Sequence, residues 1–390
     1  MAVVAVCHLP LIGFSLGFRI PNQDAEAIAR GNAFVATADN PSALYYNAAG
    51  LTQLEGEMVQ VGYHLLSVNS EYDSFGGRHG ETKFEVLPVP QLYFTCSPKD
   101  SPFSYGLGIY APFGLGLKWQ EPSPFRTLAI EGRMTYVTLH PALAWEIHPT
   151  LSLGVGPTLN YSKVQIRQGI VSSNDEFQFH GDDFAFGGTL GLLWKPHRQW
   201  SVGVSYRSAT TMNYRGDLEL RPYAKAVTAS AELDFPQIVT AGVSFRPTDQ
   251  WNIEINVDWT DWDSLNTVTF KRAPSDIPFA LNWKSSFLYE LGVTRKLDRG
   301  YFISAGYFFS ENSTSEQNFS PLVPDTDLHV GSLGFGRKGR RWDWAVSGQI
   351  ITGPSRRVAS AQSTSLAGET ANGRYQWFNQ ALNLSVAYKF

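Results

Sequence analysis

The chain ends in Ala381-Leu382-Asn383-Leu384-Ser385-Val386-Ala387-Tyr388-Lys389-Phe390, and these ten residues decide between two fold classes. Side chains alternate between the two faces of a β-strand with a period of two residues. One face of this segment carries the large apolar side chains of Leu382, Leu384, Val386, Tyr388 and Phe390, and the other carries Asn383, Ser385 and Lys389. A chain that stops on an aromatic residue at the end of such a strand is typical of the closing strand of an outer-membrane β-barrel. The alternative is an edge strand of a soluble β-sandwich.

Composition excludes several other classes. Hydrophobic residues make up 43% of the chain, charged residues 17%, and the net charge is -4 over 390 residues. After the N-terminus no apolar run approaches the ~20 residues of a helical membrane span, whereas a barrel strand needs only ~9–11 residues. The 14% of aromatic residues and the 35 glycines favour β-structure. Basic residues do not cluster with aromatic ones, so nucleic acid is not an expected partner.

Residues 1–17 are predicted to be a signal peptide that is cleaved. They are mostly apolar, and Ser15-Leu16-Gly17 offers a small-x-small cleavage site. No Lys or Arg precedes the apolar run, so the signal is atypical or the true start lies upstream. Cys7 as a lipoprotein cysteine is a weaker alternative, because Val4-Ala5-Val6 before it matches poorly. After cleavage only Cys96 would remain, which excludes an intramolecular disulfide.

From Met58 onward, alternating segments are separated by two kinds of connection. Short polar turns rich in Pro and Asp recur about every fifty residues, for example at 97–101, 148–150 and 247–250. Longer polar connections lie between them, near 119–132, 168–182, 216–232, 265–283, 312–326 and 355–374. Outer-membrane barrels have short turns on the periplasmic side and long loops outside.

Fourteen strands are predicted, an even number as bacterial single-chain barrels require. Their approximate ranges are 58–72, 84–97, 103–118, 133–147, 150–167, 183–195, 200–215, 233–246, 251–264, 284–296, 301–311, 327–338, 342–354 and 376–390. Several of them resolve into an apolar and a polar face, as when Trp251, Ile253 and Ile255 oppose Asn252 and Glu254. Tryptophans gather at strand ends, where interfacial girdles lie. We therefore expect an all-β, fourteen-stranded antiparallel transmembrane barrel over residues 56–390.

Residues 18–55 do not alternate. Asp24–Arg30 is predicted to be a short helix, and Asp39-Asn40-Pro41-Ser42 is a helix start with a capping residue before Pro. A unit of about forty residues hardly folds alone. It is expected to form a small helical hatch inside the lumen. A barrel of fourteen strands encloses a lumen too wide to be filled by side chains of the wall alone. A periplasmic tail is the alternative.

The chain resembles the FadL family of outer-membrane transporters of long-chain fatty acids and related hydrophobic compounds. The resemblance rests on Gly17-Phe18-Arg19-Ile20-Pro21-Asn22-Gln23, Ala29–Ala33, Ala38–Ser42 and Tyr46–Leu51. It continues in Leu233–Pro236, Gly242–Asp249, Thr260-Asp261-Trp262 and Leu322–Asp327. It covers essentially the whole mature chain. It implies a fourteen-stranded barrel with an N-terminal hatch in the outer membrane. This chain has Asn47-Ala48-Ala49 where the family usually carries Asn-Pro-Ala. In the family, this part of the hatch reaches the wall beside a kinked third strand.

The predicted third strand contains a local defect. Gly106, Gly108, Ala111-Pro112-Phe113-Gly114 and Gly116 lie in one strand, and Pro lacks a donor while Gly weakens strand packing. With the resemblance, Pro112, Phe113 and Gly114 are interpreted as a lateral opening in the wall. A plain bulge that adjusts barrel curvature is the alternative.

The resemblance implies passive uptake of fatty acids or other hydrophobic compounds through an apolar pocket, hatch movement and sideways exit. Phe18 and Ile20 are the candidate gates, and Asn47, Ala48 and Ala49 are candidate residues at the hatch contact. A carboxylate head group would need a cation, and Arg167 and Lys284, at strand ends in regions that resemble family pocket positions, are the candidates. The alternative is that each is a rim or loop charge. The expected partners are such a hydrophobic molecule and outer-membrane lipid; we expect a monomer with no cofactor and no metal.

Two alternative functions come from other classes. An outer-membrane lipase or protease would need a catalytic set, but of the eight histidines only His140 lies clearly on a lumen face. No Ser, His and acidic residue are brought together by position, so we expect no enzyme. A polar-solute porin would leave the lumen open, which the predicted hatch argues against.

Overall fold

The computed structural model describes residues 16–271, 276–362, 365 and 367–390. The predicted signal peptide, residues 1–17, therefore lies outside the described residues except for its last two positions. No helix in the described ranges is long and apolar enough to cross a membrane.

Short helices occur mainly in the first forty described residues, and strands make up most of the rest. The helices are α1 (Ala25–Ala29), α2 (Ala43–Tyr46), η1 (Ala48–Gln53), η2 (Trp262–Ser264) and η3 (Asp298–Gly300). The first strands are β1 (Gly56–Val68), β2 (Ser70–Asp73), β3 (His79–Glu81), β4 (Glu85–Ser97), β5 (Phe103–Tyr110), β6 (Gly114–Lys118), β7 (Glu131–His148), β8 (Leu151–Gln168) and β9 (Glu176–His197). Next come β10 (Trp200–Arg207), β11 (Thr210–Arg221), β12 (Ala224–Phe235), β13 (Ile238–Phe245), β14 (Trp251–Thr260), β15 (Thr267–Lys271), β16 (Ile277–Ala280) and β17 (Ser286–Lys296). The last are β18 (Tyr301–Ser310), β19 (Leu328–Lys338), β20 (Trp342–Thr352), β21 (Arg356–Val358), β22 (Gly373–Trp377) and β23 (Asn379–Lys389).

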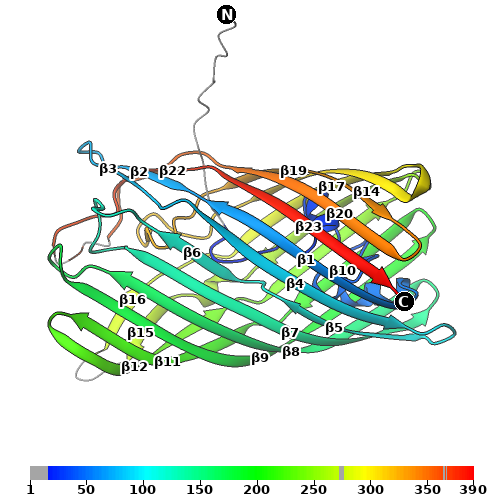
Figure 1. The fold of residues 1–390 in the computed structure, drawn as a ribbon, viewed down its shortest axis with the longest axis horizontal. Helices are drawn as coiled ribbons and strands as arrows, with labels where there is room; N and C mark the ends of the chain where they lie inside the picture. The colour runs from blue at the N-terminus through cyan, green and yellow to red at the C-terminus, as the bar shows by residue number, and fades with distance from the viewer. Residues whose placement is uncertain (1–15, 272–275, 363–364, 366) are drawn as a thin grey trace, which may run out of the picture.

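The strands close into a single antiparallel barrel, which confirms the predicted fold class (Figure 1). Nineteen strand segments form this sheet, and β5/β6, β10/β11, β12/β13, β14/β15 and β16/β17 are each consecutive pieces of one interrupted strand. The barrel therefore has the fourteen strands that the sequence predicts. Closure is made by the two ends of the sheet, where β1 pairs with β23 from Met58 opposite Lys389 to Leu66 opposite Ala381.

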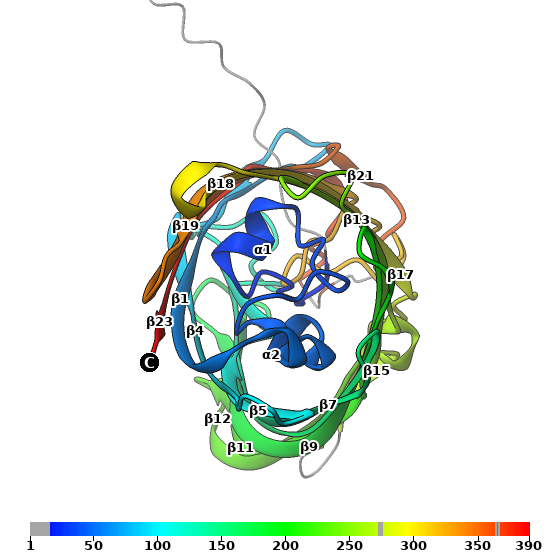
Figure 2. The same ribbon diagram turned by 90° about the vertical axis from the view of Figure 1, so that its right-hand side faces the viewer.

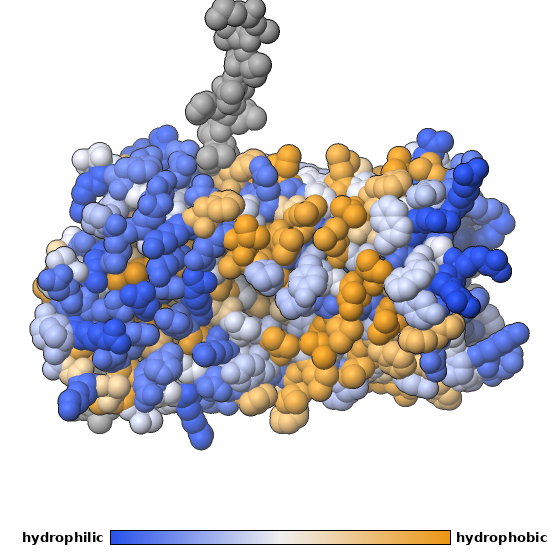
Figure 3. Space-filling model, in the orientation of Figure 1, coloured by the Kyte–Doolittle hydropathy of each residue, from blue (hydrophilic) through white to orange (hydrophobic). Residues whose placement is uncertain are grey.

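The two faces of the strands are inverted relative to a soluble protein. On β23, Leu382 and Leu384 are 48% and 40% exposed, whereas Asn383 between them is fully buried. On β14, Ile255 is 58% exposed while Glu254 and Asp258 are buried. Apolar residues therefore face outward, and polar residues face the lumen. Figure 3 shows the result on one face of the barrel, as an apolar band between hydrophilic ends. This band suits the hydrocarbon layer of a membrane.

The N-terminal hatch lies inside the lumen, as expected. Viewed along the barrel, α1 and α2 lie within the ring of strands (Figure 2). Helix α1 packs against β18, β19, β20 and β23, and η1 packs against β7, β8 and β9. Asp24 caps α1 by accepting hydrogen bonds from the backbone N–H groups of Glu26 and Ala27. The hatch thus contacts opposite sides of the wall.

The two ends of the barrel differ. Short turns lie at the end that carries the C-terminus, and the longer connections, including the separate sheet β21-β22-β2-β3, lie at the other end (Figure 1). An aromatic cluster that includes Tyr72, Trp119, Phe125, Phe319 and Tyr375 holds these long connections together. The end with the long loops is therefore the external one.

Candidate ligand path and gate

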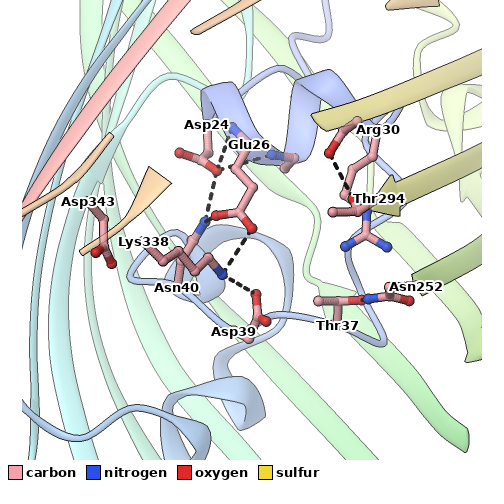
Figure 4. Close-up of polar contacts among 12 residues, drawn as sticks. Asp24, Glu26, Arg30, Thr37, Asp39, Asn40, Asn252, Thr294, Lys338 and Asp343 are labelled. Atoms are coloured by element: carbon pink, nitrogen blue, oxygen red, sulfur yellow. Dashed lines mark hydrogen bonds and ion pairs between the residues drawn. The ribbon is translucent and has the colours of Figure 1, made fainter. Parts of the chain in front are cut away.

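The hatch is anchored to the wall by buried and half-buried polar groups (Figure 4). The Nζ atom of Lys338, at the end of β19, lies 2.9 Å from Oε1 of Glu26 and 3.1 Å from Oδ1 of Asp39. Burial disfavours the Asp39 carboxylate, but the positive charge of Lys338 outweighs this and lowers the pKa of Asp39. Asn40 bridges the helix cap by donating to Asp24 at 3.0 Å and to Glu26 at 3.1 Å. A second anchor is Glu254 of β14.

Glu254 accepts two hydrogen bonds from the hatch. Its Oε1 lies 2.8 Å from the backbone N of Ala36, and its Oε2 lies 2.5 Å from Oγ1 of Thr37. The guanidinium of Arg30 is 3.6 Å from the same carboxylate. Because Glu254 is fully buried, removing these partners would leave a charge without compensation in the lumen. Residues 24–40 are therefore fixed against β14 and β19.

Glycines in the wall allow the hatch backbone to approach closely. A Cβ atom added at Gly306 on β18 would lie 2.0 Å from the backbone N of Gly31. A Cβ at Gly154 on β8 would lie 2.4 Å from the backbone N of Ala49. No side chain fits at either position while the hatch is in place. The wall is therefore shaped to receive the hatch.

Residues 16–20, the N-terminal segment, continue from the hatch into the middle of the lumen. Phe18 packs against Phe113, Phe235, Trp262 and Trp283, with ring centroids between 4.8 and 6.1 Å apart. Arg19 points to β14, where its Nη1 and Nη2 atoms lie 2.5 and 2.7 Å from the two carboxylate oxygens of Asp258. This bidentate pair is buried, and Thr260 accepts a further hydrogen bond from Arg19 at 2.8 Å. The segment is thus held by aromatic packing and by one ion pair.

The third strand of the barrel is interrupted, and the N-terminal segment fills part of the break. Between β5 and β6, the backbone N of Ile20 donates to the carbonyl of Pro112, and the N of Gly114 donates to the carbonyl of Phe18, both at 2.8 Å. Phe113 is buried. The predicted defect at Pro112, Phe113 and Gly114 is therefore the place where residues 18–20 join the wall.

The wall is also open on the other side of this break. Pairing between β4 and β5 ends at Leu92 opposite Ile109. Backbone hydrogen bonding between the second and third strands of the barrel resumes where the N–H of Lys83 donates to the carbonyl of Lys118. Pro88 and Pro90 lie in this stretch of β4 and have no N–H to donate. A stretch of the wall is therefore without a hydrogen-bond ladder.

Three apolar cavities adjoin one another from the external end to this break. The vestibule, about 640 Å³, is lined mainly by residues 168–170, 277–281 and 317–322. The inner chamber, about 140 Å³, shares Phe279, Leu281, Ser320 and Leu322 with the vestibule. The wall cavity, about 420 Å³, is lined by residues 16–22, 87–90, 109–111, 113–117 and others. Phe18, Leu115, Arg133, Met134 and Val323 line both the inner chamber and the wall cavity.

The remaining candidates from the sequence lie elsewhere. Asn47 donates to the carbonyls of Val35 and Leu192, and a Cβ at Gly191 would lie 2.4 Å from its Oδ1. Ala48 and Ala49 lie beside it, and Ala48 belongs to the same buried cluster as Tyr110, the last residue of β5. None of these three residues lines any of the three cavities. They seat the hatch at the wall.

Arg167 and Lys284 also lie outside the three cavities. Arg167 is paired with Glu131 at 2.8 Å and with Glu176 at 2.7 Å, and Lys284 is exposed. The residues that line the cavities and that the sequence does not single out include Arg19, Trp283, Met134, Leu322 and Val323. Arg19, Leu322 and Val323 stand in the segments that carry the family resemblance, which is the signal that could have identified them.

His140 is a buried lumen residue with two neutral partners. Its Nδ1 lies 3.0 Å from the hydroxyl of Tyr110, and its Nε2 lies 2.8 Å from the hydroxyl of Thr189. No acidic group orients the ring in the contacts of the described residues. A structural interpretation of His140 suits this environment better than a catalytic one.

Comparisons with known proteins agree with this geometry. A family model described as "Outer membrane protein transport protein (OMPP1/FadL/TodX)" matches residues 11–390. The long-chain fatty acid transport protein of Escherichia coli K12 is 20% identical over 386 residues, which cover 85% of this chain and 86% of that protein.

Two crystal structures have a similar fold. That of a FadL homologue from Pseudomonas aeruginosa superimposes with a TM-score of 0.87 at 17% identity, covering 96% of this chain and 100% of the other. That of the toluene transporter TodX from P. putida gives a TM-score of 0.75 at 15% identity, covering 94% and 98%. At these identities the structures establish the fold alone.

Proposed function

The chain belongs to the OMPP1/FadL/TodX family of outer membrane transport proteins, and from this membership we propose that it carries hydrophobic small molecules inward by passive diffusion. It is a bacterial outer-membrane β-barrel. Long-chain fatty acids and other hydrophobic compounds are both candidate substrates. One similar protein is named as a long-chain fatty acid transport protein and another as a toluene transporter. The proposed route runs from the vestibule through the inner chamber to the wall cavity, and then sideways through the break in the third strand.

One observation carries the proposal. The wall cavity is lined by residues from both faces of the wall: Tyr110 and Tyr136 face the lumen, while Ile109 and Val137 belong to the outward face. The cavity also adjoins the stretch of wall between Leu92 and Lys83 where no hydrogen-bond ladder joins β4 to the third strand. A ligand in the wall cavity thus lies beside the membrane, and leaving sideways would keep it out of water.

Energetics favour this route. Burial of each methylene gains ~0.8 kcal/mol, so release of a hydrophobic ligand into water would lose what its capture gained. Release into lipid loses little, because one apolar environment replaces another. We propose that Phe18 and Ile20 are the moving parts and that the anchored residues 24–40 stay in place. Displacement of Phe18 would join the inner chamber to the wall cavity, because its ring lines both.

The sideways route is tested by filling the break. A Cβ atom at Gly116 would lie 2.5 Å from Cδ1 of Leu87 across the gap, so Gly116→Phe should obstruct it. The matched control is Gly331→Phe on β19, where a Cβ has no neighbour within 4 Å. Uptake of a radiolabelled hydrophobic compound by cells lacking related transporters is the measurement. We expect at least a tenfold loss of uptake with Gly116→Phe and none with Gly331→Phe.

Two results would count against the proposal. Undiminished uptake by a folded Gly116→Phe protein would place the exit elsewhere. Uptake of a labelled sugar, with no uptake of the hydrophobic compound, would indicate a porin instead. Two further predictions are that residues 1–17 are a signal peptide that is cleaved and that the protein is a monomer. N-terminal sequencing checks the first, and the mass of the purified protein in solution checks the second.

A further inference from the structure

Two neighbouring turns at the end of the barrel that faces the periplasm form a cluster of basic residues. One turn connects β17 to β18, and the other connects β19 to β20. Together with the strand ends beside them, residues 295–300 and 337–341, they contain Asp298 as their one acidic residue. Their basic residues, here called the basic cluster, are Arg295, Lys296, Arg299, Arg337, Lys338, Arg340 and Arg341.

The positive charge of the basic cluster is largely uncompensated. Lys338 is paired with Glu26 and Asp39 of the hatch. The other six cations are exposed, and none of them forms an ion pair with another described residue. The Nε atom of Arg337 donates to the carbonyl of Arg299 at 3.2 Å, which joins the two turns through a neutral acceptor. Exposed cations that are held together without carboxylates favour an anionic partner.

Two members of the basic cluster lie on the outer side of the barrel. Arg295 and Arg337 are exposed, and they share the outward faces of β17 and β19 with apolar side chains of the band. The guanidinium carbon of Arg295 lies 5.4 Å from the ring centroid of Trp251, and that of Arg337 lies 5.2 Å from the ring centroid of Tyr301. Aromatic residues at strand ends mark the boundary between lipid and water. The two guanidinium groups therefore lie at the level of the lipid headgroups.

The spacing of these two arginines suits a single headgroup. Strands β17 and β19 both pair with β18, so one strand separates Arg295 from Arg337. Neighbouring strands are ~4.8 Å apart, which places the two backbones roughly 10 Å from each other. A guanidinium group donates two parallel hydrogen bonds to a phosphate, and two long side chains can turn toward a shared one. Arg299 and Arg340, in the adjoining turns, add positive charge on the aqueous side.

The basic cluster is confined to one side of the barrel. Across the ring of strands from β18 and β19 lie the turns between β4 and β5 and between β7 and β8 (Figure 2). The described residues 97–102 and 146–150 of these turns carry Lys99 together with Asp100 and Glu146. A uniform attraction of the whole periplasmic rim to the membrane would not produce this difference. The charges therefore indicate one binding site beside β17–β20.

We infer that the basic cluster binds an anionic phospholipid of the inner leaflet of the membrane. Arg295 and Arg337 hold the phosphate, the cations of the turns add attraction, and the acyl chains lie against the apolar band. Groups of about four to eight Lys and Arg residues beside a membrane are typical of anionic lipid recognition. An acidic protein could reach the turns, but not the lipid-covered side of the barrel where Arg295 and Arg337 lie. The inference concerns the outer surface and goes beyond the proposed uptake.

Phosphatidylglycerol and phosphatidylcholine with the same two oleoyl chains are matched probes, because they differ in net charge and share their apolar part. Each lipid is titrated into the purified full-length protein in detergent, and native mass spectrometry resolves the protein with and without bound lipid. We expect the native protein to bind phosphatidylglycerol at least tenfold more tightly than phosphatidylcholine. The difference should shrink as salt is added, because screening weakens the attraction between exposed charges.

Removal of the two outward arginines locates the site. Arg295→Gln combined with Arg337→Gln should weaken phosphatidylglycerol binding at least tenfold and leave phosphatidylcholine binding unchanged. The matched control is Arg357→Gln combined with Arg374→Gln, which removes the same charge from β21 and β22 at the external end. Both control arginines are exposed, and the guanidinium carbon of Arg357 lies 5.0 Å from the ring centroid of Phe75, so the stacked geometry is repeated there. The control should bind phosphatidylglycerol as the native protein does.

A second variant, Arg295→Lys combined with Arg337→Lys, keeps both charges and should retain the preference for phosphatidylglycerol. Three results would overturn the inference. Equal affinity of the native protein for the two lipids would show that charge is not recognised. Equal losses in the glutamine variant and in the external control would show that the site is not at the basic cluster. Displacement of bound phosphatidylglycerol by an equimolar amount of polyglutamate would assign the basic cluster to an acidic protein instead.

Discussion

At the scale of single residues, the ion pair between Arg19 and Asp258 determines how the N-terminal segment is held. Both side chains are almost completely buried, at 5% and 2% exposure. Breaking a buried pair by removing one partner costs ~3–5 kcal/mol, because the remaining charge has no compensation. Arg19 stands between the two proposed moving residues, so this pair is the main polar restraint on them.

We therefore predict that Arg19→Met releases the N-terminal segment without unfolding the barrel. The backbone N of Ile20, which donates to the carbonyl of Pro112, should exchange its hydrogen at least tenfold faster. Hydrogen exchange followed by mass spectrometry measures this directly. Arg340→Met, at an exposed position in a turn, is the control and should leave exchange at Ile20 unchanged. Unchanged exchange in Arg19→Met would mean that aromatic packing alone holds the segment.

The sequence could not show this pair, although it pointed to its neighbours. Phe18 and Ile20 are predicted gates because they are apolar and close to the mature N-terminus. Arg19 lies 239 positions before its partner, and the alternating pattern of β14 says only that Asp258 faces the lumen. Arg167 and Lys284 are candidates because they are cations at strand ends in regions that resemble family pocket positions. The sequence does not reveal that Glu131 and Glu176 already pair with Arg167.

At the scale of elements, the fit between hatch and wall depends on glycines at a few lumen-facing positions. The Cβ of any other residue at Gly306 would collide with the backbone of Gly31, whereas the strand itself would accept a β-branched residue. We predict that Gly306→Val displaces the hatch and leaves the barrel closed. Single-channel recordings in planar bilayers should show larger ion conductance than the native protein gives.

Gly331→Val on β19 is the matched control, because a Cβ there meets nothing within 4 Å. It should conduct like the native protein. Native conductance in a folded Gly306→Val protein would mean that the hatch can move away from β18 and still fill the lumen.

The elements themselves were largely predictable, because alternation and turn residues are local signals. The defect in the third strand also followed from its glycines and Pro112. What the sequence could not supply is the partner of that defect. Residues 18–20, which precede the first strand, hydrogen-bond to it, and Pro88 and Pro90 weaken the neighbouring β4. The breaks within strands, such as β10/β11, are not predicted by the alternating pattern. The buried face shifts there from odd positions, such as Ser201 and Gly203, to even ones, such as Thr210 and Met212.

At the scale of the whole molecule, lipid must surround the apolar band. We predict that Ile255→Arg, in the middle of β14 and on its outer face, lowers the free energy of unfolding in lipid vesicles by ~2–4 kcal/mol. Trp251→Arg, at the end of the same strand, should cost only about 0–1 kcal/mol, because the interface tolerates charge. Denaturant titrations give both values. Equal effects at the two sites would contradict a membrane-embedded band.

The pairing of β1 with β23 sets an order for biogenesis. The first strand has no partner on that side until the final residues of the chain arrive. Helix α1 finds its seat on β18–β20 and β23, which are themselves the last strands to be synthesised. The N-terminal part of the chain therefore cannot dock until the last strands are made. It must already lie inside the forming barrel when β1 pairs with β23. A mutation that slows the pairing of β1 with β23 would expose the hatch to periplasmic proteases for longer. The finished barrel would be indistinguishable from the native one.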